Sequence, residues 1–501
     1  MSRSARPTES KNLVRSARPP GSSAPAPVAR ARRHVYLSVE ERVARGKAAR
    51  QQAPRPSHRK WEPATDRLDP VALLEEQCES RVPELVPIRN GRMATSPFTF
   101  FRGAALIMAA DLASTPQSGV NVQLCGDAHL SNFGVFGSPE RQLMFDINDF
   151  DETLPGPWEW DVKRLAASCE ILGRDRGFAV SDRRAIVRAG VAEYRNVMRR
   201  AANMRTLDVW YDHLDIEEVL DWVHTEAAEG RIRKKEAREA EEDVAKARTR
   251  DSTRVFAKRA DEVDGKLRIV ADPPLVVPFD DLADPETSPG ELEKQIFSLI
   301  QRYRRSLSDH HHPIEEFDYV HSARKIVGVG SVGTRAWIHL FVGRDDQDPL
   351  FLQSKEADAS VLERFVGKSE HAEHGRRVVV GQRLMQAASD IFLGWFRVKV
   401  TDGRVRHYYV RQFHDWKGGV DVETFRVPGA TLYARLCGAT LARAHARWGD
   451  RIAVASYLGK GDAFDKAIAD FAAEYADQNE RDFDTFVEAV KSGRLAAETG
   501  V

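Results

Sequence analysis

The sequence predicts an α+β protein in which a β-rich segment interrupts a mainly helical chain. Residues 70–315 carry apolar-faced and mixed-charge stretches of the kind that form helices. Residues 316–413 carry short β-branched and aromatic runs divided by turn residues, and residues 414–501 have a helical pattern again. The length of 501 residues predicts two to four domains or lobes.

Residues 1–65 differ from the rest of the chain in composition. They are rich in Arg, Pro, Ser and Ala, as in the run 19–27. Such a segment buries too little apolar surface to offset the entropy lost on ordering, so we expect a mostly disordered basic tail. The tail is either a contact for an acidic surface or a plain solvated extension.

Charge and cysteine content disfavour several classes of protein. The 75 basic and 75 acidic residues balance, so no global basic field favours nucleic acid. The four cysteines form no CxxC pair, which disfavours a disulfide framework or a zinc ribbon. No stretch approaches the ~20 apolar residues of a membrane helix, and the N-terminus lacks the apolar core of a secretory signal. We therefore expect a cytoplasmic protein without membrane contact, and the sequence leaves its oligomeric state open.

The predicted elements follow a definite order along the chain. Before residue 316 we expect helices at 71–77 and 98–113, a strand at 120–125, and helical structure at 160–172, 182–263 and 291–306. Prolines at 273, 274 and 278 mark a break before the last of these helices. In the β-rich segment we expect a helix at 375–388 and strands at 325–327, 336–342, 350–354, 391–400 and 407–413.

The run 126–151 carries the first set of chemically active residues. Asp127 is followed five residues later by Asn132, and a predicted hairpin over 133–147 returns Asp149 to the same place. Phosphoryl transfer needs a carboxylate that orients the attacking hydroxyl, and oxygen ligands that hold Mg²⁺ against the phosphates. Asp-x-x-x-x-Asn is the spacing of the kinase catalytic loop, in which the two residues are base and metal ligand. The alternative is a polar hairpin whose Asp and Asn residues cap turns.

This segment resembles the catalytic core of aminoglycoside and choline kinases, which has a Gly-Asp-x-His-x-x-Asn loop and a later Asp-Phe run. The resemblance implies that Asp127 is the base, Asn132 a Mg²⁺ ligand and Asp149 the main Mg²⁺ ligand. Asp146 could replace Asp149, because the hairpin is longer than usual.

Three further residues have supporting roles under this resemblance. His129 would only orient the loop by hydrogen bonding, without proton transfer. Asp151 completes the Asp-Phe-Asp run, and Asp161 resembles the Asp of the following helix that braces the loop.

A second set of residues lies in the β-rich segment. Gly328, Gly330 and Gly333 form a GxGxxG pattern, and the run 336–342 after them is typical of a strand. Strand, glycines and strand form the kinase flap that covers the phosphates, whereas a dinucleotide fold needs a helix after the glycines. The alternative is a glycine-rich hairpin without a ligand.

Lys355 ends the next strand, at the place of the kinase lysine that contacts the α- and β-phosphates. Its glutamate partner stays open among Glu363, Glu370 and Glu373.

These parts occur in a rotated order. The glycine flap of ordinary kinases precedes the catalytic loop, but here it follows by about two hundred residues. The run 407–413 resembles the last small-lobe strand and hinge, and 433–445 resembles the helix that leads into the catalytic loop. We infer a circularly permuted, two-lobed, protein-kinase-like fold. Its small lobe would be 316–413, and its large lobe would combine 70–315 with 414–501. Permutation is tolerable when the original termini lie close together.

At whole-chain level, residues 70–495 resemble the bacterial domain of unknown function 2252 family, which is grouped with kinase-like proteins. The matching motifs lie at 86–89, 101–103, 125–134, 148–152, 328–333 and 478–481. The resemblance implies a fold group but no substrate.

Two other signals each have two interpretations. Arg102 could reach a phosphate, because a guanidinium fork matches phosphate oxygens, or it could form a structural ion pair. The histidines at 310–312 could suggest a metal, but adjacent histidines rarely form a closed site, so we expect a solvated loop.

The sequence therefore predicts an ATP- and Mg²⁺-dependent phosphotransferase that acts on a small hydroxylated acceptor, as the kinases that the loop resembles do. Acceptor sites in such folds are built by large-lobe helices, here within 170–310. The alternatives are a nucleotide-binding regulatory module without turnover, and nucleotidyl transfer by the same fold.

Overall fold

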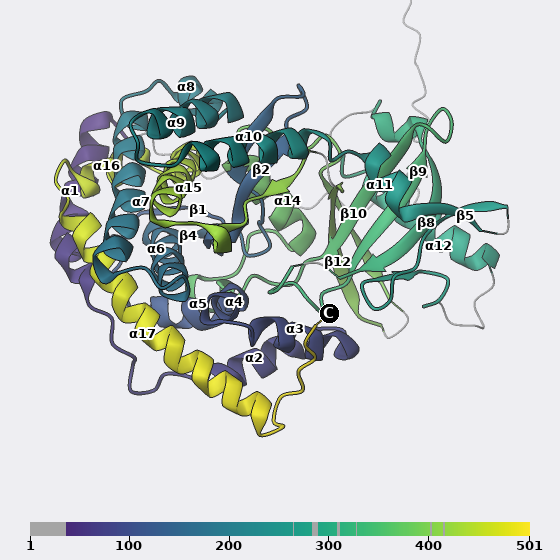
Figure 1. Cartoon of the computed structure of the whole chain (residues 1–501), viewed down its shortest axis with the longest axis horizontal. Coiled ribbons are helices and arrows are strands. Elements are labelled where there is room, and N and C mark those ends of the chain that lie inside the picture. The colour runs from purple at the N-terminus through teal and green to yellow at the C-terminus, as the bar shows by residue number, and fades with distance from the viewer. Residues whose placement is uncertain are drawn as a thin grey trace, which may run out of the picture. The chain divides into compact units, whose positions relative to one another are not determined.

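The predicted α+β class is confirmed, since helices and antiparallel sheets both form the fold (Figure 1). The computed structural model describes residues 37–263, 265–282, 289–307, 311–326, 328–400, 403–413 and 416–500. The predicted disorder of residues 1–36 therefore lies outside the described residues. Among the described residues, no helix combines the length and apolar character needed to span a membrane.

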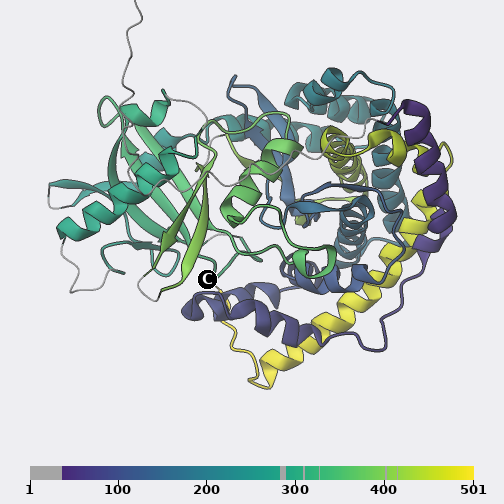
Figure 2. The same ribbon diagram turned by 180° about the vertical axis from the view of Figure 1, so that it is seen from behind.

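The predicted tail is corrected over residues 39–59, which the prediction placed in a disordered segment. Helices α1 (Val39–Gln52) and η1 (Arg55–Arg59) form there. In both views α1 lies beside α16 (Arg451–Leu458) (Figures 1 and 2). Arg50 donates to the carbonyl of Tyr457 at 2.7 Å, which satisfies one of the last carbonyls of α16. Composition alone does not reveal such contacts with a distant helix.

A group of short helices precedes the first strand. They are α2 (Pro70–Cys78), η2 (Pro83–Leu85), α3 (Val86–Met93), α4 (Pro97–Gly103) and α5 (Ala105–Ala113). The single helix predicted at 98–113 is thus two helices that meet at Ala104. The break frees carbonyls for buried arginines, because Arg164 donates to Phe101 O at 2.9 Å and Arg89 to Gly103 O at 3.0 Å.

The predicted hairpin forms within a small set of strands. Strand β2 (Phe133–Gly137) pairs with β3 (Leu143–Ile147), and β13 (Gly418–Gly419) pairs with the other edge of β2. Strand β1 (Asn121–Leu124) pairs with β4 (Leu154–Pro157). The loop between β1 and β2 includes η3 (Leu130–Asn132), and helix α6 (Trp158–Asp175) follows β4 directly.

Further helices and a hairpin lead to the main sheet. The helices are α7 (Val180–Ala201), α8 (Thr206–Tyr211), α9 (Ile216–Ala228), α10 (Lys234–Arg248) and α11 (Ser252–Arg259). The helical stretch predicted to reach residue 263 therefore ends earlier. It gives way to the hairpin of β5 (Ala260–Val263) and β6 (Lys266–Ile269).

Six antiparallel strands form the main sheet in the order β11-β12-β10-β9-β8-β7. They are β7 (Val276–Pro278), β8 (Asp318–Lys325), β9 (Ala336–Val342), β10 (Pro349–Glu356), β11 (Gly394–Lys399) and β12 (Val405–Gln412). Helices α13 (Glu363–Val366) and α14 (His374–Met385) lie between β10 and β11 in the chain, and η4 (Pro313–Glu316) precedes β8.

The sheet begins earlier than residue 316, where the small lobe was predicted to start. Its first strand, β7, contains Pro278 and lies at the edge, where a residue without an N–H is tolerated. Helix α12 (Pro289–Arg304) also packs on β11, and the Tyr303 hydroxyl donates to Phe392 O at 2.6 Å. The prolines therefore mark an edge strand as well as a break.

The remaining elements are η5 (Val422–Thr424), α15 (Val427–Trp448), α16 and the long α17 (Ala463–Lys491). Helix α15 packs closely on α7, because a Cβ atom at Gly438 would lie only 2.1 Å from the carbonyl oxygen of Gly190. One hydrophobic core contains residues of α6, α7, α15 and strands β1–β4. This core surrounds the loop between β1 and β2 that carries the predicted site.

Candidate functional site

The loop that contains Asp127 is held by a buried network. Asp161, at the start of α6, accepts hydrogen bonds from the backbone N–H groups of Cys125 at 2.8 Å and Gly126 at 3.0 Å. The same carboxylate lies 3.1 Å from Nε2 of His445, whose Nδ1 lies 2.9 Å from the Tyr194 hydroxyl. Asp161 thus occupies the position predicted for a brace, and α7 and α15 add two partners that the sequence analysis did not identify.

Gly126 is required by this geometry. Its φ is +85°, a left-handed conformation that favours glycine. A Cβ atom at this position would also lie 2.4 Å from the carbonyl oxygen of Glu152. Gly126 therefore lets the loop turn directly against the chain that follows β3.

Asp127 is fixed through one of its two carboxylate oxygens. Arg164 Nε donates to Asp127 Oδ1 at 2.6 Å. The other oxygen, Oδ2, lies 3.7 Å from His129 Nε2. The Arg164 side chain is 3% exposed and the Asp127 side chain 20%, so the pair is anchored on the buried side and open toward the cavity. Arg164 follows Asp161 by three residues on one helix face, and this spacing was the available sequence signal.

His129 is a buried neighbour of the loop. Its backbone N–H donates to Asp127 O at 2.8 Å. Burial lowers the pKa of His129 to about 4, with the nearby Asp127 carboxylate acting in the opposite direction. The imidazole is therefore neutral at pH 7. Its buried Nδ1 has no hydrogen-bond partner among the described residues, and the orienting hydrogen bond expected of this side chain stays a prediction.

Asn132 and Asp149 come together at the end of the hairpin. Asn132 Nδ2 donates to Asp127 O at 2.8 Å, and the Asn148 N–H donates to Asn132 O at 2.8 Å. Burial alone would raise the pKa of Asp149, but Lys355 and Arg411 lower it below its ordinary value. Both Asn132 and Asp149 line the cavity described below.

Asp146, the other candidate for this role, lies elsewhere. Its side chain is buried on β3, and its Oδ1 accepts the N–H of Ile147 at 2.8 Å. Burial raises the pKa of Asp146, although Arg447 opposes that shift. Asp149, rather than Asp146, is the residue that lines the cavity.

Lys355 reaches the same site from β10. Its Nζ donates to the Asp151 carboxylate and, at 2.8 Å, to Ser331 Oγ, and it lies 3.9 Å from Asp149 Oδ2. Asp151 also accepts the Tyr409 hydroxyl at 2.9 Å. Asp151 is therefore the closest acidic partner of the lysine.

The predicted glutamate partner is not found. Within the described residues, no contact joins Lys355 to any of the three candidates, Glu363, Glu370 and Glu373. Glu373 instead accepts the Trp395 indole N–H at 3.0 Å. Helix α14 contributes Arg377, which donates to Asp151 O at 2.7 Å and Thr153 O at 2.8 Å. Arg377 binds main-chain oxygens, which every residue has, so the residue types in the sequence did not indicate this contact.

The glycine loop, residues 328–334, joins β8 to β9. Gly328 and Gly333 have φ values of +70° and +90°, which favour glycine. A Cβ atom at Gly330 would lie 2.9 Å from the carbonyl oxygen of Arg102, so the loop packs against the end of α4. Gly328 and Gly330 line the cavity, whereas Gly333 contacts the side chain of Arg81.

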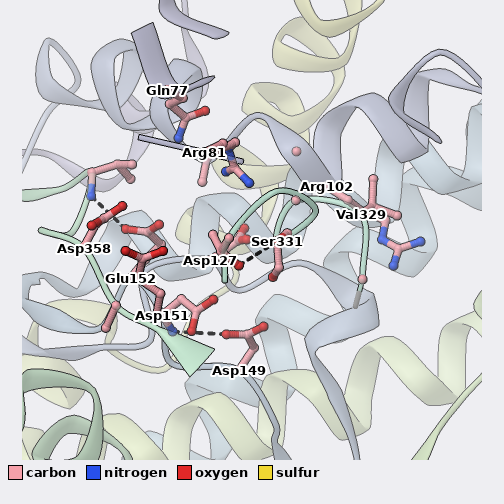
Figure 3. Close-up of a pocket in the computed structure, with 18 of the residues that line it drawn as sticks. Gln77, Arg81, Arg102, Asp127, Asp149, Asp151, Glu152, Val329, Ser331 and Asp358 are labelled. Carbon is pink, nitrogen blue, oxygen red and sulfur yellow. Dashed lines mark hydrogen bonds between the residues drawn. The ribbon is translucent and has the colours of Figure 1, made fainter. Parts of the chain in front are cut away.

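Several of these residues line one cavity of about 230 Å³, namely Asp127, His129, Asn132, Asp149, Asp151, Gly328, Gly330 and Ser331. Lys355 is buried beside Asp151 and is not among the described lining residues. Figure 3 shows Asp127, Asp149, Asp151 and Glu152 on the cavity wall, which Ser331 of the glycine loop also lines. Burial raises the pKa of Glu152 to about 7, although Arg377 and the Val361 N–H act in the opposite direction. The site thus combines the Asp149 and Asp151 carboxylates beside Lys355 with the Glu152 carboxyl, whose pKa is raised to about 7.

The cavity walls come from segments that were not expected. The prediction placed the acceptor wall within 170–310, but among the described residues that line the cavity none belongs to that range. The walls are built by the chain around α2, α4 and the residues after β10, namely Gln77, Ser80, Arg81, Arg102, Gly103, Ala105, Asp358, Ala359 and Val361. Arg102, the one member of this set considered beforehand, lies 3.9 Å from Glu423 and also lines the cavity.

The donor set suits a hard cation with few protein ligands. In the part of the chain that the structure describes, no group of three or more His, Cys, Asp or Glu residues could hold a metal ion. The carboxylate of Asp149 and the amide of Asn132 are oxygen donors of the kind that Mg²⁺ uses when it keeps several waters. His312 is occupied otherwise, since its Nδ1 accepts the Ile314 N–H at 3.1 Å. His310 lies outside the described residues.

Comparison with known proteins gives a family but no characterised relative. Neither a search of curated proteins nor a search of solved structures finds a match. The loop between β1 and β2, residues 125–132, is called the base loop after the role predicted for Asp127. A family model matches residues 81–489, which include the base loop, the hairpin, the glycine loop and Lys355. The chain therefore belongs to the family described as uncharacterized proteins conserved in bacteria (DUF2252).

Proposed function

We propose that this protein is an ATP- and Mg²⁺-dependent phosphotransferase that acts on a small hydroxylated molecule. One observation carries the proposal. Asp127, Asn132 and Asp149 line a single cavity with the glycine loop, although about two hundred residues separate these parts in the sequence. Base, cation ligands and phosphate-binding backbone are the groups that phosphoryl transfer requires.

The order of elements supports a kinase-like fold for the nucleotide-binding part. Strand β8, the glycine loop, β9, β10 with Lys355, helix α14, and then β11 and β12 follow one another along the chain. This is the order of parts in a kinase small lobe, where the lysine follows the glycine flap and precedes a helix. We infer that the six-stranded sheet is the small lobe and that the helical part with β1–β4 is the large lobe.

Circular permutation is supported by the end of α15. A Cβ atom at Gly449 would lie 2.4 Å from Val122 Cγ1 in β1. Arg45 contacts the residues that flank both elements, with Nη1 3.4 Å from Asp450 Oδ2 after α15 and Nη2 3.4 Å from Gly119 O before β1. A chain in ordinary kinase order would join this helix to this strand by a short loop. Such proximity is expected where a permutation has cut the chain between two elements that stay packed together.

The reaction follows from the placement of Asp127. The acceptor hydroxyl attacks the γ-phosphorus of ATP, the bond from that phosphorus to the bridging oxygen breaks, and ADP leaves. Arg164 holds Asp127 Oδ1, so Oδ2 is the oxygen that accepts the hydroxyl proton. Lys355 and the glycine-loop backbone would hold phosphates, and Asn132 and Asp149 would hold Mg²⁺. The cation would neutralise charge on the phosphates.

ATP consumption with Mg²⁺, measured with and without a pooled metabolite extract, tests the proposal. We expect extract-stimulated consumption in the wild type and a loss of at least about 100-fold in Asp127→Asn, because a general base contributes roughly 10²–10⁴ in rate. ATP affinity should change little in that variant. Asp149→Ala should also lose consumption.

Asp146→Asn is the matched control, because Asp146 belongs to the same hairpin but lies away from the cavity. It should keep wild-type consumption. Tight ATP binding without consumption would instead favour a regulatory module, and an AMP adduct in the product mass would indicate nucleotidyl transfer. Absence of nucleotide binding would overturn the proposal.

A further inference from the structure

The glycine loop is held from outside its own sheet. The Val82 N–H donates to Gly333 O at 2.8 Å, and Arg92 Nη1 donates to Gly328 O at 2.6 Å. Arg81 Nη1 donates to Val332 O. Three carbonyls of one short loop are thus bound by a single segment, residues 81–92, which we call the strap.

Apolar packing accompanies these hydrogen bonds. Val82, Leu85 and Ile88 of the strap form a buried cluster with Ile326 and Val332. Val332 is fully buried in the middle of the loop. The loop could cover phosphates with its backbone alone, without a buried apolar cluster. The cluster therefore shows that the strap and the loop are packed together, beyond their hydrogen bonds.

The strap is itself anchored at its other side. The Glu498 N–H donates to Pro87 O at 2.8 Å, and Asn90 Nδ2 donates to Ala496 O at 2.9 Å. A Cβ atom at Gly91 would lie 1.8 Å from Glu498 O, so the C-terminal chain runs directly against α3. The strap therefore connects the glycine loop to residues 496–498 and to the end of α4, where Gly103 O accepts a hydrogen bond from Arg89.

We propose that the strap positions the glycine loop for the nucleotide phosphates, with Arg81 and Arg92 as its positioning residues. The proposal rests on the proposed function. A glycine-rich loop loses much conformational freedom when it closes on a ligand. A loop that is already fixed by the strap loses less, so its affinity for a triphosphate is higher. Arg81 also lines the cavity, so the same side chain contacts both the cavity and the carbonyl of Val332 in the loop.

Two variants and a matched control test this assignment in the full-length protein. Arg92→Ala and Arg81→Met each remove one donor from a loop carbonyl. Arg494→Ala is the control, because Arg494 binds Glu75 of α2 at 2.7 Å on the surface and makes no contact with the loop among its described partners. We measure hydrogen exchange of the backbone over residues 328–334, and the dissociation constants of Mg-ATP and of adenosine.

We expect faster exchange in the loop for both variants, unchanged exchange in the base loop, and about a tenfold weaker affinity for Mg-ATP. Adenosine affinity should stay within about twofold, since adenosine carries no phosphates, and Arg494→Ala should match the wild type. Unchanged loop exchange and ATP affinity in both variants would overturn the strap alone. Equal losses for ATP and adenosine would also overturn it. A wild-type protein that binds no nucleotide would instead overturn the proposed function.

Discussion

The base loop and the glycine loop face one cavity but are fixed in different ways. The base loop is held by side chains that lie inside the main core, and both Asp161 and His445 are at most 1% exposed. The glycine loop is held by guanidinium groups and an apolar cluster at the rim of the sheet, and Arg92 reaches it from the surface. Because its anchors lie inside the core, we expect the base loop to open only when the whole protein unfolds. We expect the glycine loop, whose anchors lie at the rim, to open locally while the rest of the protein stays folded.

The largest effect is expected for Asp161→Asn, which alters the buried network that holds the base loop. In the wild type each carboxylate oxygen of Asp161 accepts one backbone N–H, from Cys125 or Gly126. An asparagine side chain has only one oxygen, so one of these N–H groups would face the NH₂ group of the amide and lose its acceptor. Because buried unsatisfied donors cost about 1–3 kcal/mol each, we expect a loss of about 3 kcal/mol in the free energy of unfolding. Urea denaturation measures it. Asp345→Ala, at an exposed ion pair with Arg344, is the control and should change stability by less than about 0.5 kcal/mol.

A smaller, pH-dependent effect is expected for Glu152→Gln, whose backbone lies against Gly126 of the base loop. The folded protein holds the Glu152 proton up to a pKa of about 7, whereas the unfolded chain releases it near 4.5. The unfolded state therefore binds fewer protons between these values, and wild-type stability falls as pH rises through that window. Glutamine removes the fall. Because Glu152 is partly exposed at the cavity, we expect the variant to gain about 1–2 kcal/mol over the wild type between pH 5 and pH 8.

Urea unfolding of both proteins at the two pH values gives this difference. Asp146→Asn is unsuitable as its control because burial raises the pKa of Asp146 too. Gln77→Ala, at the same cavity but without a titrating group, serves instead. A stability difference between Glu152→Gln and the wild type that is identical at pH 5 and pH 8 would contradict the raised pKa.

The smallest effect is expected where the strap meets β8. Arg324 lies 2.8 Å from Glu84, whose side chain is 58% exposed. A double-mutant cycle with Arg324→Ala and Glu84→Ala should give a coupling of about 0.5 kcal/mol that weakens in high salt. A coupling above about 2 kcal/mol would mean that this rim behaves like the buried network, which would remove the contrast between the two loops.

Features coded by neighbouring residues were predictable. Turn residues between two apolar runs located the hairpin of β2 and β3, and the spacing of Asp127, Asn132 and Asp149 located one wall of the cavity. Short apolar runs with aromatic or β-branched residues, divided by turn residues, located β9, β10 and β12 within a few residues.

Features that depend on distant contacts were not predictable. Helix α1 is stabilised by α16, which lies about four hundred residues further on. Lys355 pairs with Asp151 across 204 residues, and a nearby glutamate was the expected partner. One wall of the cavity is built by Gln77, Ser80 and Arg81, whose residue types are ordinary for a helix end. In each case the partner is chosen by tertiary packing, which local pattern does not contain.

The contact between Asp161 and His445 also bears on how the protein is made. The two residues are 284 positions apart, so the ribosome adds His445 roughly 15–60 s after Asp161 at about 5–20 residues per second. During that interval a nascent chain carries the base loop without the helix that completes its brace. Helix α15 must emerge before the loop reaches its final geometry, so a chain released early lacks an ordered site even though it contains Asp127, Asn132 and Asp149.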